Sequence, residues 1–205
     1  IALRELYATL ALASKWVHNN VSWAFMLALV LVFVLWVAHN IPNMTDLRWM
    51  AKAGGLFSKG VHPPAKKFNA GQKVVFWSVV VLGFLISLSG LSLLFPFQLP
   101  IFDKIFDALN ATGLASLILG APLPEMLTPY QEMQLAQVVH AIVAFAFIAI
   151  VIAHIYLGSV GMEGAFDAMG SGEVEEQWAR EHHSIWYEEE MARKTAPPER
   201  AAPAE

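Results

Sequence analysis

The strongest constraint on this chain is an apolar segment that holds two histidines and no charged side chain. The thirty residues from Met133 to Met162 contain no Asp, Glu, Lys or Arg, yet they contain His140 and His154. A helix of this length crosses a hydrocarbon core of about 30 Å. An imidazole inside a membrane is costly unless it is bonded, so both histidines are candidate functional residues.

The spacing of the two histidines places them on one helix face. Fourteen helical steps rotate by about 1400°, within about 40° of whole turns, and rise about 21 Å. The two rings would therefore lie one above the other, each near one side of a bilayer. This arrangement suits the axial ligands of two haems. The alternative is that each ring forms a hydrogen bond to a neighbouring helix or carbonyl.

Composition points to an all-α integral membrane protein. The chain is 57% hydrophobic and 15% charged, and it has no cysteine. Iron–sulfur ligation, thiolate haem ligation and disulfides are therefore excluded, and histidine or methionine must hold any redox metal. No basic stripe indicates nucleic acid. We predict three transmembrane helices, at about 16–40, 74–96 and 133–160.

The distribution of Lys and Arg predicts the orientation. The loop 41–73 carries six cationic residues, whereas the loop 97–132 carries only Lys104. Loop 41–73 and the acidic tail 163–205 should then be cytoplasmic and loop 97–132 external, with residues 1–162 forming the transmembrane domain. Within the external loop, Ile101–Leu119 is expected to be one amphipathic helix.

Helix depth pairs His18 with His140. His18 lies 22 residues before Asn40, and His140 lies 22 residues before Met162. Both helices run the same way, so the two imidazoles should reach one iron at similar depth. His154 has no such counterpart. We expect a further transmembrane helix on the N-terminal side of Ile1 to supply it, completing a four-helix bundle. Interfacial or soluble hydrogen-bonding roles are expected for the other four histidines, which are His39, His62, His182 and His183.

Several motifs resemble those of one family. They are WVHNN, AHNIPN, KFNAGQKVVFW, MQLAQVVHA, AHIYLG, GAFDAMGSGEV and EHHSIWYEEE, and they cover most of 15–191 except the external loop. The chain resembles the gamma (cytochrome b) subunit of membrane-bound respiratory formate dehydrogenases. The paired histidines alone are shared with the cytochromes b of hydrogenases and thiosulfate reductases.

The resemblance implies a four-helix, di-haem cytochrome b in the bacterial inner membrane. Such a subunit passes electrons from an iron–sulfur (beta) subunit, served by a molybdenum or tungsten catalytic (alpha) subunit, through two b haems to quinone. His18 and His140 would ligate the outer haem. His154 would ligate the inner haem together with a histidine from the family's first helix. The subunit would not oxidise formate itself. The alternatives are a cytochrome b of a hydrogenase or thiosulfate reductase, and a haem-free anchor or proton-relay subunit.

The resemblance also implies a quinone beside the inner haem, near His154. Asn69 and Gln72 lie three residues apart where the basic loop enters the second helix, so their side chains can face the same direction. Their uncharged amides can bond a quinone oxygen without burying a charge. Asn69 can alternatively serve as the N-cap of the helix.

Overall fold

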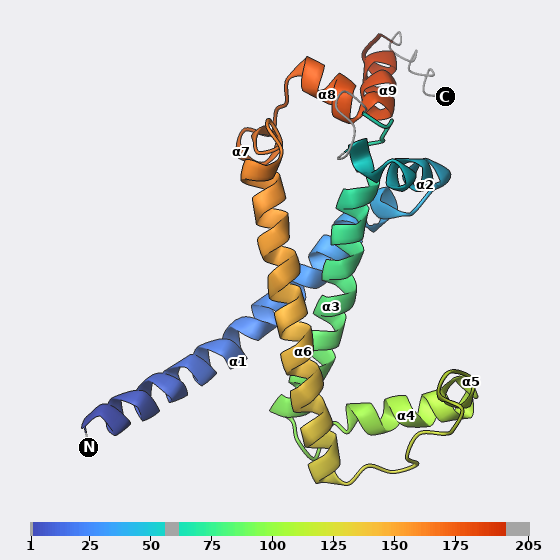
Figure 1. The fold of residues 1–205 in the computed structure, drawn as a ribbon. Helices are drawn as coiled ribbons and strands as arrows, with labels where there is room; N and C mark the ends of the chain where they lie inside the picture. Colours follow the sequence, from blue (N-terminus) through green and yellow to red (C-terminus); the bar gives the residue numbers. More distant parts are fainter. Residues whose placement is uncertain (1, 56–61, 196–205) are drawn as a thin grey trace, which may run out of the picture. The chain divides into compact units, whose positions relative to one another are not determined.

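A computed structural model describes residues 2–55 and 62–195 of this chain. Helices and loops make up these residues, and no strand occurs among them (Figure 1). The helices are α1 (Ala2–Trp36), α2 (Met44–Ala51), α3 (Ala70–Leu94), α4 (Ile101–Ala111), α5 (Leu114–Leu119), α6 (Pro129–Tyr156), α7 (Asp167–Gly170), α8 (Glu176–His182) and α9 (Ser184–Thr195).

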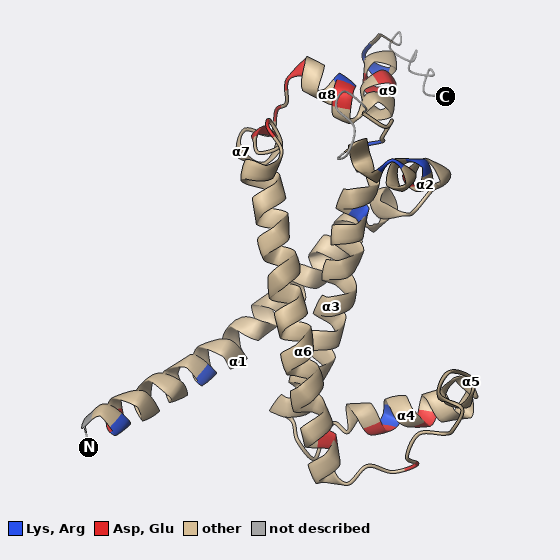
Figure 2. Ribbon diagram, in the orientation of Figure 1, with Lys and Arg blue, Asp and Glu red and all other residues tan. Residues whose placement is uncertain are grey.

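Three helices are long and apolar enough to cross a membrane. They contain or extend α1, α3 and α6, with bounds Leu3–Asn40, Ala70–Leu94 and Pro129–Gly161 within the described residues. Charged side chains are absent from long stretches of α3 and α6 (Figure 2). The predicted all-α membrane class with three spans is confirmed. All three helices begin earlier than the sequence predicted, α1 by most of its N-terminal half.

The chain forms two compact units. The first comprises residues 1–35 and 78–151, and the second comprises residues 36–77 and 152–205. This division reflects which residues pack together. The predicted boundary at residue 162, between the transmembrane domain and the cytoplasmic tail, concerns position in the membrane and stays a prediction.

In the first unit, small residues of α3 let the neighbouring helices approach. A Cβ added to Gly83 would lie 2.7 Å from a methyl carbon of Leu29, so any larger residue would require this α1 side chain to shift. Aromatic rings add contacts at both neighbours of α1, with Trp23 6.5 Å from Phe95 and Phe25 5.7 Å from Phe147 between ring centres. Few side chains of the spans are buried, which leaves them free to face lipid or another helix.

The loop after α3 contains two helices. The single helix predicted over Ile101–Leu119 is wrong, because Gly113 adopts a φ of 71° and separates α4 from α5. Pro100 gives α4 no side-chain cap. Glu132 of α6 supplies it instead, accepting hydrogen bonds from Phe102 N at 2.9 Å and Asp103 N at 3.0 Å. Ser92 Oγ of α3 donates to the same carboxylate at 3.0 Å, so Glu132 ties three helices together.

In the second unit, the connection between the first two spans is held by a buried ion pair. Lys73 Nζ, in α3, lies 2.8 Å from Asp46 Oδ2 of α2 and donates to Ile41 O at 3.1 Å. Asn43 caps α2, and the Asp46 carboxylate accepts from Asn43 N at 2.7 Å in return. These bonds fix the turn that follows α1 against the start of α3.

The C-terminal tail is attached to that same connection. Ile185 N donates to Ala65 O at 3.1 Å, and His183 Nδ1 donates to Lys66 O at 2.8 Å. Trp178 Nε1 donates to Glu163 O at 2.9 Å and sets the direction of α8. The second unit therefore brings the tail beside the segment that leads into α3.

Candidate haem-binding site

His18 and His140 face each other across α1 and α6. Their ring centres are 6.1 Å apart and the ring planes are perpendicular. A metal–imidazole bond of about 2.0–2.1 Å, plus about 1.1 Å from nitrogen to ring centre, gives about 6 Å for two rings on opposite sides of one metal. The pair therefore has the separation that bis-imidazole ligation of a haem iron needs.

Ser89 of α3 fixes the orientation of His140. Its Oγ lies 3.0 Å from His140 Nδ1, and its hydroxyl donates to Leu85 O at 2.9 Å. With the hydroxyl hydrogen directed at Leu85 O, the oxygen is left as an acceptor, and the matching tautomer of His140 has its hydrogen on Nδ1. Nε2 is then unprotonated and able to bind iron. Metal-ligating histidines are commonly held in this way by a bond to their second nitrogen.

Gly90 gives His140 the space beside Ser89. A Cβ at this position would lie 3.3 Å from His140 Cε1, closer than nearly all real contacts. In the sequence, Ser89 and Gly90 are only two small residues within an apolar segment. The sequence signal for this contact is a serine next to a glycine on a helix that packs against the helix carrying His140. That signal is weak.

His154 lies in the last turn of α6 with an exposed side chain. Across residues 2–55 and 62–195, it makes no hydrogen bond or ring contact, so the structure supplies one imidazole here rather than a pair. The same ranges contain no cluster of three or more His, Cys, Asp or Glu residues suited to a metal ion. A haem iron with two axial histidines does not need such a cluster.

Asn69 and Gln72 cap the start of α3 through each other. Gln72 N donates to Asn69 Oδ1 at 2.9 Å, and Asn69 N donates to Gln72 Oε1 at 2.9 Å. Both amide oxygens are thus used, while the two side-chain NH2 groups remain as donors. Gly71 between them packs under Trp49, whose Cη2 would lie 3.1 Å from an added Cβ. The arrangement is an N-cap that still offers hydrogen-bond donors.

The remaining histidines lie in the second unit. His39 is exposed, 6.4 Å from the Phe68 ring. His62 lies 4.9 Å from His182 between ring centres, and Trp178 lies against His182 and His183. Burial lowers the pKa of His182, and positive charge at His62 and His183 lowers it further.

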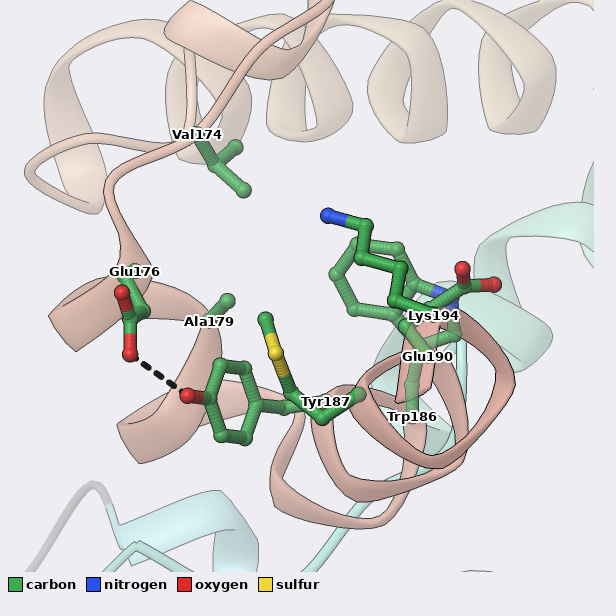
Figure 3. Close-up of a pocket in the computed structure, with 8 residues that line it drawn as sticks. Val174, Glu176, Ala179, Trp186, Tyr187, Glu190 and Lys194 are labelled. Carbon is green, nitrogen blue, oxygen red and sulfur yellow. Dashed lines mark hydrogen bonds between the residues drawn. The ribbon is translucent and has the colours of Figure 1, made fainter. Parts of the chain in front are cut away.

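A pocket of about 260 Å³ lies between α8 and α9 (Figure 3). Tyr187 donates its hydroxyl hydrogen to Glu176, and Arg180 donates to both of them at 3.1 and 2.9 Å. The Tyr187 bond, followed by the Arg180 charge, lowers the pKa of the Glu176 carboxyl. All three groups hold α8 against α9, and none of them lies on a membrane-spanning helix.

Three spanning helices, two of which carry histidines at ligand spacing, define a multi-pass membrane protein of the cytochrome type. Residues 2–172 match the family model described as prokaryotic cytochrome b561, and the chain belongs to that family. Membership implies that it binds haem b.

The curated relatives are cytochrome subunits. The chain is 27% identical over 174 residues to the nitrate-inducible formate dehydrogenase cytochrome b556(Fdn) subunit of Escherichia coli K12, covering 84% of the chain and 68% of the relative. It is 25% identical to the formate dehydrogenase cytochrome b556(fdo) subunit of the same strain, covering 94% and 77%. The Haemophilus influenzae formate dehydrogenase cytochrome b556 subunit is 24% identical, with 94% and 70% covered. The resemblance predicted from the motifs is confirmed.

Proposed function

We propose that the protein is the membrane electron-transfer subunit of a formate dehydrogenase complex. Electrons would come from an iron–sulfur (beta) subunit fed by a molybdenum or tungsten catalytic (alpha) subunit, pass through two b haems, and reduce quinone. Formate oxidation would reside in the partner. The family match and the names of the relatives support this role.

The observation that carries the proposal is the pair His18–His140, with His140 bonded to Ser89. These two imidazoles would be the axial ligands of the outer haem, which supplies one-electron transfer when bound. Ser89 keeps the His140 ring in the ligating tautomer. The apolar side chains of the spans exclude water and so keep the electron route separate from proton exchange.

His154 would hold the inner haem with a second ligand from a helix packed beside α6. Its imidazole is exposed in the last turn of α6. Inside a membrane such a ring needs a bonding partner, which the neighbouring helix would supply. A quinone near this level would receive hydrogen bonds from the Asn69 and Gln72 amides, since a quinone oxygen is an acceptor and both amide oxygens are already used.

The proposed orientation places loop 41–73 and the tail in the cytoplasm and loop 97–132 in the periplasm, with the protein in the bacterial inner membrane. Lys73 counts toward this orientation although Asp46 pairs with it, because acidic residues weigh little in the rule. The other five cationic residues of loop 41–73 still outnumber Lys104 in the external loop.

A reduced-minus-oxidised visible spectrum of membranes that contain the complex tests the haem sites. We expect two b haems in the wild type. His18→Ala and His140→Ala should each lose the same single haem, whereas the control His39→Ala should keep both. Absence of any haem signal would leave a haem-free anchor, and two haems in both variants would refute the pairing. Identifying the co-purifying catalytic subunit separates a formate dehydrogenase from a hydrogenase or thiosulfate reductase.

The quinone contact is tested by a variant that keeps the cap. Asn69→Ser retains an oxygen acceptor for α3, at a stability cost well below the roughly 1 kcal/mol of a lost cap, but removes the amide donor. We expect quinone to reoxidise the haems more slowly, with donor reduction unchanged. A wild-type rate in this variant would assign Asn69 to capping alone.

A further inference from the structure

A small cavity of about 20 Å³ lies in the second unit where the tail meets the start of α3. Its walls include Asn69, His62, His182, Glu181, Trp49 and Met162. A water needs at least about 10–15 Å³ of such volume and two to four polar partners. The cavity therefore has room for one water, with an amide, two imidazoles and a carboxylate around it.

The two imidazoles connect this cavity with the aqueous phase. His62 is exposed, His182 is half-buried, and their ring centres are 4.9 Å apart. Histidine is the side chain that most readily exchanges protons near neutral pH. Burial and the charges of His62 and His183 lower the pKa of His182, while the Glu181 carboxylate acts in the opposite direction. His182 therefore releases a bound proton more readily than a histidine with an ordinary pKa.

We propose that His62 and His182 are the proton entry to the quinone site at Asn69, acting through one water held in this cavity. The inference rests on the proposed function. Reduction of one quinone to quinol takes two electrons from the haem route and two protons from the aqueous phase. In each transfer, protonated His182 gives its N–H proton to the water, which passes one of its own to a quinone oxygen. His62 then returns a proton to His182 from solvent.

The surrounding side chains suit this path. Trp49 and Met162 are apolar walls that keep the cavity at about one water rather than an open channel. Glu181 is exposed and carries the charge that stabilises a transient imidazolium. His183 is not part of this path, because its Nδ1 donates to Lys66 O at 2.8 Å.

The experiment uses the whole complex in membranes with His62→Gln, His182→Gln and the double variant. Glutamine keeps polar atoms but does not titrate. At pH 8 we expect quinone to reoxidise the haems about 100-fold more slowly in the double variant, the lower end of what a positioned acid or base contributes. Haem spectra should be intact. Reoxidation by a one-electron acceptor that takes up no proton should be unchanged, and added imidazole should restore the quinone rate. His39→Gln is the matched control.

The outcomes separate the inference from the function on which it rests. Wild-type quinone rates in both histidine variants would overturn the proton entry and leave the electron-transfer role intact. Equal slowing with both acceptors, or slowing that imidazole does not relieve, would overturn it in favour of a structural role. A wild-type complex that does not reduce quinone at all would overturn the proposed function itself.

Discussion

In the proposed haem site, the hydroxyl of Ser89 would select which nitrogen of His140 is available to iron. Ser89→Ala removes the acceptor for Nδ1–H and lets the ring change tautomer or turn. Loss of such a partner typically lowers metal affinity by about 10–100-fold. We expect haem titration of the purified subunit to show weaker binding of one haem.

The chain contains a close control for this variant. Ser87→Ala removes the same atoms from the same helix, but Ser87 only donates to Gly83 O at 2.7 Å. It should bind haem as the wild type does. Equal haem affinity in the Ser89 and Ser87 variants would contradict the role of Ser89.

The sequence was sufficient to identify His18 and His140 as candidate ligands, but not to identify Ser89 as the contact of His140. Spacing along apolar segments was enough to predict that His18 and His140 lie close together, since depth in a membrane follows directly from helix rise. Serines in such helices usually bond back to their own backbone, as Ser87 does. Only the packing of α3 against α6 distinguishes Ser89.

At the scale of elements, Glu132 holds α4 to the ends of α3 and α6. Glu132→Ala would leave the buried Phe102 N–H, the partly buried Asp103 N–H and the Ser92 hydroxyl without their acceptor. Each such group costs about 1–3 kcal/mol. We expect a lower Tm for the purified complex and faster amide exchange at the start of α4, with haem content unchanged. Glu125→Ala, at an exposed position, is the control. An equal Tm for the two variants would contradict the anchoring role.

The docking of α8 and α9 should depend on pH. Burial lowers the pKa of His183, and the Lys66 carbonyl bond offsets this only in part. The detached ring, with a pKa of about 6.5, binds a proton more readily than the docked ring. Docking is therefore most stable above pH 6.5 and weakens as the pH falls, by at most about 1.4 kcal/mol per pH unit for one group.

Amide exchange reports this docking directly. Ile185 N–H bonds to Ala65 O, so its exchange should accelerate below pH 6.5 after correction for the intrinsic pH dependence. The amides of α4 in the same sample provide that correction. His183→Gln should remove most of the acceleration. A corrected rate that stays flat from pH 7.5 to 5.5 would count against the histidine as its cause.

The element bounds show where periodicity stops being informative. The apolar pattern of 101–119 is continuous, but Gly113 ends α4 because it adopts a positive φ. The backbone conformation of a glycine within an amphipathic segment cannot be inferred from the sequence pattern. The reciprocal cap of Asn69 and Gln72 was foreseeable, because an amide three residues after Asn is a known N-terminal pattern.

For the whole molecule, hydropathy was sufficient to predict the spans but not the packing units. Three apolar runs determine three helices, since no other structure satisfies the backbone in lipid. The attachment of the tail to residues 65–66 depends on His183 and Ile185, which carry no recognisable long-range signal in the sequence. Contacts between segments more than a hundred residues apart follow from folding and not from local pattern.

The orientation of the protein in the membrane can be determined by labelling introduced cysteines from one side. The chain has no cysteine, so a single introduced thiol is labelled without background from this subunit. Lys67, Lys104 and Glu189 are exposed and lie in the first loop, the external loop and the tail. Cationic residues near helix ends are retained on the cytoplasmic side during insertion. In intact spheroplasts, a membrane-impermeant thiol reagent should label Lys104→Cys at once, and Lys67→Cys and Glu189→Cys only after lysis. Labelling of Lys67→Cys before lysis, with Lys104→Cys protected, would reverse the orientation and move the proton entry at His62 and His182 to the outer side.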